Sequence, residues 1–197
     1  MKRILWIVAF LLPGGPAAAD HRPAVEWSSW VRLGYGRASP EAEARKRGGV
    51  TSPDESADHW ELGGGVEASL PIAPGGDVRL GAWGEARTAS WPVAGVELVI
   101  GAAPAKLDMF FYEGEGILAF RAGGNRDVTT AAVTYGYRCP WDLWGPWEGA
   151  TRYMIGVRFV ASATRSNDNP EDWTVSFGLE TEPVGALRYL LGIRDWY

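Results

Sequence analysis

The feature that most constrains this chain is a strict alternation of apolar and polar side chains over residues 60–87. Successive side chains on a β-strand point to opposite faces, so alternation over this length predicts two long strands joined by the turn at residues 73–76. Their apolar faces hold Trp60, Leu62, Val66, Ala68, Leu70, Ile72, Val78, Leu80, Ala82 and Ala86. Their polar faces hold Glu61, Glu67, Arg79, Glu85 and Arg87, with Trp83 as the one large exception.

The same period continues along the chain. It predicts nine strands, at residues 27–37, 60–72, 78–87, 93–103, 107–122, 128–138, 151–163, 173–180 and 186–197. The count of nine is one more than eight and one fewer than ten. Either the glycines at residues 113–116 divide the strand at residues 107–122 into two, or one predicted strand is false. With turn signals at the spacing of an all-β fold, we predict an antiparallel up-and-down β-barrel of about eight strands, within a range of eight to ten.

Two connections have an unusual composition. The long polar loop at residues 38–58 is rich in charge and turn formers, and Ser39-Pro40-Glu41 could begin one short helix within it. Residues 139–149 hold two prolines and three tryptophans and show no period, which predicts a second loop.

The N-terminus has the pattern of a secretory signal peptide. A basic start and a short apolar run precede Ala17-Ala18-Ala19, so we expect cleavage after Ala19. The apolar run is too short for a helical membrane anchor, which needs about 20 residues. Cleavage leaves 197 − 19 = 178 residues, which suits a single domain over residues 20–197.

The expected mature chain is acidic and offers little catalytic chemistry. The signal peptide removes two of the 19 basic residues, so the net charge becomes 17 − 24 = −7, which disfavours nucleic acid as a partner. The single Cys139 cannot form an internal disulfide, and His21 and His59 do not supply a cluster of zinc ligands. Residues 167–172 lack the spacing of a calcium loop. We therefore expect no metal, no cofactor and no enzymatic activity.

Alternation does not show which face of the sheet contacts water. A soluble barrel places its apolar face inside, whereas a barrel of the transmembrane type places it against lipid around a polar interior. The polar faces favour the transmembrane type, because they combine glycines with charges of both signs that can neutralise one another in a narrow interior. The predicted interior ion-pair network comprises Glu61, Glu67, Glu85, Glu97, Glu180, Arg79, Arg87, Arg152, Arg158, Arg188 and Arg194.

Three further features also favour a membrane barrel. Several predicted strands approach ten residues or more, which is enough to cross a bilayer while tilted. One loop is long while several turns are tight. Aromatic residues, which prefer the membrane interface, gather near predicted strand ends. They are Trp27, Trp60, Trp91, Tyr153, Trp173, Tyr189 and Tyr197.

The end of the chain resembles the C-terminal signature of bacterial outer-membrane β-barrel proteins. That family ends in an aromatic residue preceded by apolar residues at alternate positions, a signal read by the barrel-assembly machinery. The matching stretch contains Tyr189, Leu191, Gly192, Ile193 and Tyr197, and Asp195 departs from the pattern. In size the mature chain is similar to the transmembrane domain of outer-membrane protein A. The resemblance implies a monomer in the bacterial outer membrane, with outer-membrane lipid and the assembly machinery as partners.

The leading hypothesis is a non-enzymatic outer-membrane barrel whose loops, chiefly residues 38–58 and 139–149, mediate surface contact or envelope integrity. One alternative is a periplasmic or secreted soluble barrel, similar to lipocalins, that binds an apolar ligand. A second alternative is an outer-membrane lipid-modifying enzyme that uses His59. Its neighbours Ser56 and Asp58 do not make a catalytic triad without the right geometry.

Overall fold

The structure is a computed structural model that describes residues 25–46, 57–74, 76–88, 90–101, 115–141 and 151–183. The expected signal peptide at residues 1–19 and the predicted last strand at residues 186–197 lie outside these ranges. So do residues 142–150 of the predicted tryptophan-rich loop.

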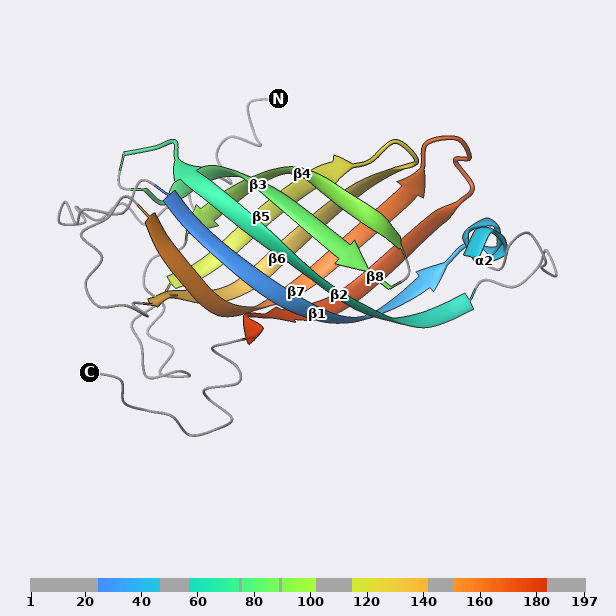
Figure 1. The fold of residues 1–197 in the computed structure, drawn as a ribbon, viewed down its shortest axis with the longest axis horizontal. Coiled ribbons are helices and arrows are strands. Elements are labelled where there is room, and N and C mark those ends of the chain that lie inside the picture. The colour runs from blue at the N-terminus through green and yellow to red at the C-terminus, as the bar shows by residue number, and fades with distance from the viewer. Residues whose placement is uncertain are drawn as a thin grey trace, which may run out of the picture.

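Eight strands form a closed antiparallel barrel in chain order (Figure 1). They are β1 (Val25–Ala38), β2 (Ala57–Pro71), β3 (Val78–Arg87), β4 (Ser90–Gly101), β5 (Glu115–Gly124), β6 (Val128–Trp141), β7 (Thr151–Ser166) and β8 (Trp173–Thr181). Each strand pairs with the next, and β8 pairs with β1 to close the barrel. The prediction of an all-β, up-and-down barrel of about eight strands is confirmed.

The stagger of the barrel follows from the strand register. Paired residues traced once around the wall from Trp27 lead back to β1 at Arg37, a shift of 37 − 27 = 10 residues. The path runs through Ala68, Ala82, Val96, Ala122, Ala131, Ala163 and Val175. Such a stagger tilts the strands against the barrel axis, and eight strands leave an interior just wide enough for side chains.

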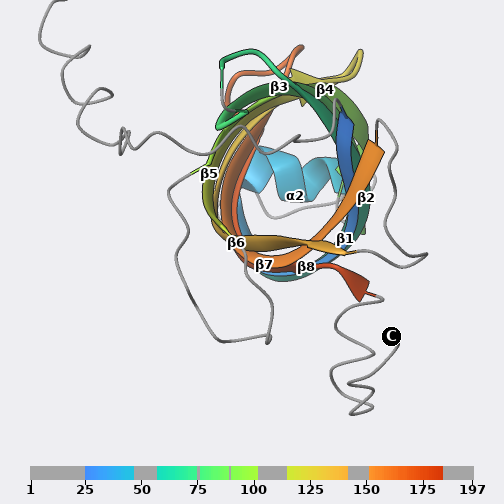
Figure 2. The ribbon, with the colours of Figure 1, turned by 90° about the vertical axis from the view of Figure 1, so that its left-hand side faces the viewer.

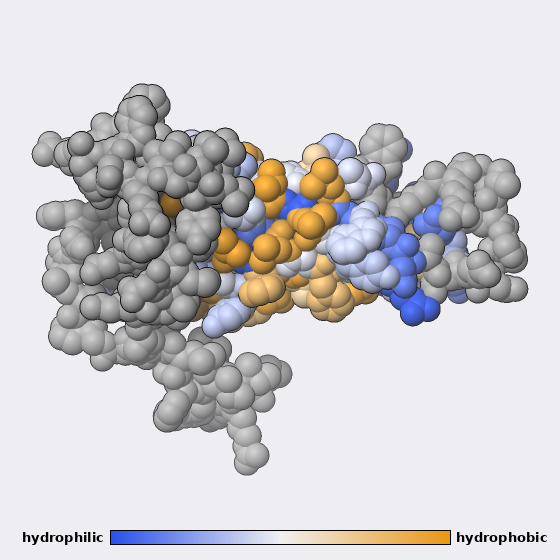
Figure 3. Space-filling view, turned by 90° about the horizontal axis from the view of Figure 1, so that it is seen from below, coloured by the Kyte–Doolittle hydropathy of each residue, from blue (hydrophilic) through white to orange (hydrophobic). Residues whose placement is uncertain are grey.

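The apolar faces of the strands point outward and the charged faces point inward. Leu70 and Leu80 are 53% and 49% exposed, whereas Arg79, beside Leu80 on β3, is fully buried. Every strand contributes large exposed apolar residues, so these side chains surround the barrel, and Figure 3 shows them as a band across its middle. One from each strand in turn is Leu33, Val66, Leu80, Val96, Phe120, Val133, Phe159 and Phe177.

The expected short helix forms as α2 (Pro40–Lys46) and lies across one end of the barrel (Figure 2). Ser39 caps it, since the Ser39 Oγ accepts a hydrogen bond from the Ala42 N–H at 3.2 Å, and Pro40 suits the first helical position. Ser39 also exchanges two hydrogen bonds with the backbone of Trp173 at the start of β8. Within the described ranges, no helix is long and apolar enough to cross a membrane.

The predicted loop at residues 139–149 is wrong for its first three residues. They continue β6, where Pro140 pairs with Met154 and Trp141 pairs with Tyr153. The reason is the long partner strand β7, which offers backbone groups from Thr151 onward. Proline removes one donor from such a ladder but keeps its carbonyl, so its presence did not end the strand.

Glycines on the inner face make room for large interior side chains. A Cβ at Gly65 would meet the Gly84 carbonyl and lie 2.5 Å from Cζ2 of Trp30, whereas a Cβ at Gly84 would meet only the Val93 carbonyl, at 3.9 Å. We expect Gly65→Ala to lower the free energy of unfolding by about 1–3 kcal/mol through overpacking. The matched variant Gly84→Ala should change it by less than about 0.5 kcal/mol. Equal effects of the two variants in denaturant unfolding would contradict the placement of Gly65 on the inner face and Gly84 on the outer face.

Candidate functional site in the barrel interior

Arg121 lies at the centre of a buried ion-pair cluster in the middle of the barrel. Its guanidinium contacts Glu67 at 2.6 Å, Glu97 at 3.1 Å and Glu180 at 2.8 Å. Arg158 shares two of these carboxylates, with distances of 2.6 Å to Glu67 and 3.3 Å to Glu180. We call these five residues the middle cluster. In it, two guanidinium groups face three carboxylates.

Two tryptophans lie beside the guanidinium groups of the middle cluster. The centre of the Arg121 guanidinium lies 4.3 Å from the ring centroid of Trp30 and 5.9 Å from that of Trp83, and Arg158 lies 5.2 Å from Trp30. Cations over aromatic faces are attracted by the ring quadrupole, most strongly where water is excluded. Both indoles are almost fully buried, which explains why Trp83 interrupts the polar face of β3.

A second cluster lies between the middle cluster and α2. Arg32 contacts Glu85 at 3.4 Å and Glu61 at 3.6 Å, and Arg87 contacts the same two carboxylates. The Arg87–Glu85 contact is bidentate, with both carboxylate oxygens accepting. We call Arg32, Arg87, Glu61 and Glu85 the upper cluster. Its charges balance, because two guanidinium groups face two carboxylates.

Serine hydroxyls on β7 and β8 extend the upper cluster. The Arg32 Nη2 donates to Ser162 at 2.9 Å and to Ser176 at 2.8 Å, and Arg87 also donates to Ser162. These hydroxyls give the buried guanidinium groups partners beyond the two carboxylates, which lowers the cost of their burial.

A third cluster lies at the end opposite α2. Glu26 forms ion pairs with Arg79 at 3.0 Å and Arg138 at 2.9 Å, and Arg138 also contacts Glu115 at 2.6 Å. The Arg79 side chain donates to Ser69 through its Nε. Together the three clusters place ion pairs along most of the barrel interior.

The structure brings most of the predicted interior residues into these clusters. They are Glu61, Glu67, Glu85, Glu97, Glu180, Arg79, Arg87 and Arg158. The side chain of Arg152 lies outside what the structure describes, as do Arg188 and Arg194. The residues of the expected C-terminal assembly signal lie outside it as well.

Sequence reasoning missed Arg32, Arg121, Arg138, Glu26 and Glu115. The signal for the arginines was present, because Arg32 lies between Val31 and Leu33 and so must point away from their face. In the same way, Arg121 follows Phe120 on one strand, so their side chains point to opposite faces. The glycines at residues 113–116 hid this pattern in β5, and Glu26 lies one residue before the predicted strand at residues 27–37.

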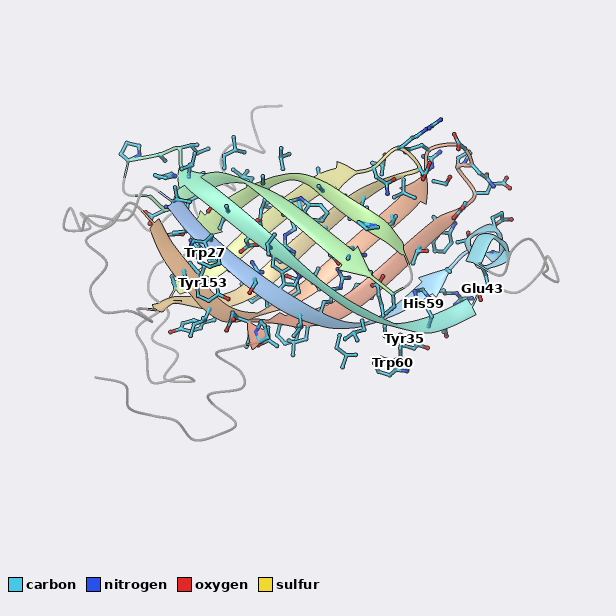
Figure 4. The ribbon with its side chains drawn as sticks, viewed as in Figure 1. Trp27, Tyr35, Glu43, His59, Trp60 and Tyr153 are labelled. Atoms are coloured by element: carbon cyan, nitrogen blue, oxygen red, sulfur yellow. The ribbon has the colours of Figure 1, made fainter. Side chains whose placement is uncertain are left out.

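His59 lies on β2 near α2 (Figure 4). Neither ring nitrogen has a hydrogen-bond partner among the residues that are described. A base that activates a nucleophile must lie within hydrogen-bond reach of it, and the described geometry brings no such pair together at His59. Among all the residues that the structure describes, no three His, Cys, Asp or Glu side chains converge to hold a metal ion.

Aromatic pairs lie on the outer surface near both ends of the barrel (Figure 4). Tyr35 and Trp60 pack edge to face at 5.3 Å toward α2, and Trp27 packs against Tyr153 at 4.4 Å toward the other end. Trp27 and Tyr35 are 35 − 27 = 8 residues apart on β1. At about 3.3 Å per residue and a tilt of about 40°, they are separated by about 20 Å along the axis.

Comparisons with known proteins assign no family to this chain. No protein-family model, no curated protein and no solved structure matches it. The geometry of the barrel is therefore the basis for a proposed function.

Proposed function

We propose that this chain is an integral β-barrel of the bacterial outer membrane with a polar interior filled by its own side chains. The observation that carries the proposal is the direction of the two faces: Val66 is 58% exposed, whereas Arg32 and Arg79 are fully buried. A continuous apolar surface of this extent is unfavourable in water and favourable against acyl chains.

The dimensions of the outer surface support the proposal. A transmembrane strand needs about 9–11 residues, and the strands here span 9 to 16. The aromatic pairs at Trp27 and Tyr35 are separated by about 20 Å, close to the roughly 25 Å apolar band that outer-membrane barrels place between their aromatic girdles.

The filled interior supports a structural or surface-contact role rather than conduction. An eight-stranded barrel holds side chains and little else, and here three ion-pair clusters occupy it. We assign the contact role to the end that carries α2, where the connection at residues 39–56 is the longest. The connections at residues 125–127 and 167–172 of the same end are short, which departs from the usual pattern of long outer loops.

The partners follow from the same proposal. Lipid surrounds the apolar band, and the barrel-assembly machinery reads the C-terminal stretch that ends in Tyr197. A soluble lipocalin-like barrel would need an apolar interior to hold its ligand. The described interior is charged instead, so we favour the membrane barrel over this second candidate and over a lipid-modifying enzyme.

Cell fractionation tests the proposal directly. We expect the protein to sediment with the outer membrane, to stay there through washes with salt and urea, and to be released by detergent. We also expect the unboiled protein to migrate differently from the boiled protein on a denaturing gel, because a folded membrane barrel resists the detergent. Release by the salt wash alone would exclude the membrane barrel and favour the soluble one.

A further inference from the structure

One part of the barrel wall departs from the antiparallel ladder. β1 pairs with β8 from Val31 to Ala38, but at Val25, Glu26 and Trp27 it pairs in parallel with β7. β8 ends at Thr181, between these two pairings. We call the place where β1, β7 and the end of β8 meet the seam.

A chain of hydrogen bonds connects the three strands at the seam. The Tyr153 hydroxyl on β7 donates to the Glu182 carboxylate, one residue after β8, at 2.6 Å. The Ser29 hydroxyl on β1 lies 2.8 Å from the same phenol oxygen. Because the single hydrogen of the phenol points to the carboxylate, Ser29 is the donor in the second bond. The ring of Tyr153 also packs against Trp27.

A small, partly open pocket lies next to this hydrogen-bond chain. Its volume is about 10 Å³, which holds about one water molecule. Ser29 and Glu182 of the seam line it together with charged residues of the interior clusters. The latter are Glu67, Arg138, Arg158 and Glu180. The seam therefore lies next to these buried charges.

We propose that the seam is a lateral gate, latched by the chain Ser29–Tyr153–Glu182, that opens to admit water to the interior ion pairs. A three-residue parallel pairing holds β1 here, whereas its antiparallel pairing with β2 covers the whole of β1 from Glu26. Parallel pairs are slightly less stable per residue than antiparallel ones, so among the described pairings we expect local opening to begin here. The gate follows from the wall geometry and does not depend on the membrane assignment.

Hydrogen exchange of the purified, folded full chain tests the gate. Tyr153→Phe removes both hydrogen bonds of the latch and keeps an aromatic ring beside Trp27. We expect about tenfold faster amide exchange at residues 25–30 and 151–156, with little change at residues 78–124. Tyr135→Phe, on the outer face of β6, is the matched control and should leave exchange unchanged. Unaltered exchange at the seam in Tyr153→Phe, or the same acceleration in every strand, would overturn the gate.

A reversible crosslink provides a second test that does not depend on the stability of Tyr153→Phe. Trp27 and Tyr153 are paired across the parallel ladder, and paired strands are about 4.8 Å apart, within the span of a disulfide. We expect the variant Trp27→Cys/Tyr153→Cys, made with Cys139→Ser, to exchange slowly at the seam when oxidised and several times faster when reduced. Identical exchange in the two states would show that the seam does not open.

Discussion

Replacement of Arg121 by methionine is expected to lower the free energy of unfolding by about 3–5 kcal/mol, because it leaves buried carboxylates without their shared partner. Arg121 contacts Glu67, Glu97 and Glu180, and Arg158 alone cannot compensate all three. Methionine is unbranched and apolar, so the main change is the lost charge rather than lost volume. Denaturant unfolding followed by the fluorescence of the buried tryptophans measures the effect.

Glu97→Gln is the matched control for this prediction. It removes one of the three carboxylates of the middle cluster and leaves two guanidinium groups with two carboxylates. We therefore expect a clearly smaller loss of stability than for Arg121→Met. An Arg121→Met variant with the unfolding midpoint of the wild type would show that the ion pairs do not stabilise the interior.

Replacement of Val66 by arginine is expected to cost about 2–4 kcal/mol in a lipid bilayer, the usual penalty for this cation on the lipid face of a barrel. Val66 is 58% exposed in the middle of the apolar outer face of β2. On a water-facing surface the same change should stay within about 0.5 kcal/mol. The measurement is the folding equilibrium in vesicles, with Val66→Leu as the control for size. An arginine variant as stable as the leucine variant would contradict a lipid-facing surface.

The fold could be predicted from the sequence because one signal repeats along it. Alternation places Leu62 and Val66 on one face and Glu61 and Glu67 on the other, without any knowledge of the neighbouring strands. The short helix was also local in origin, since Ser39 and Pro40 suit a helix start. The extension of β6 through Pro140 was missed because it depends on the partner strand β7 and not on the composition of the segment.

The contacts of the site could not be predicted in the same way. Alternation shows that Glu67 and Arg121 face inward, but they are 54 positions apart in sequence, and their contact depends on the register of the strands between them. The stagger of ten residues decides which charges share a level of the interior. Register arises from all the pairings together, so no single stretch of sequence contains it. The seam at Tyr153 is a further example, since it involves three strands.

The middle cluster contains residues of β2, β4, β5, β7 and β8, and its Glu180 belongs to β8, the last described strand in chain order. An open sheet that still lacks β8 leaves both Arg121 and Arg158 short of one partner each. Half-assembled intermediates therefore carry an electrostatic penalty that vanishes on ring closure. Such a barrel should form and come apart as a single cooperative unit, with few partly assembled species exposed to proteases.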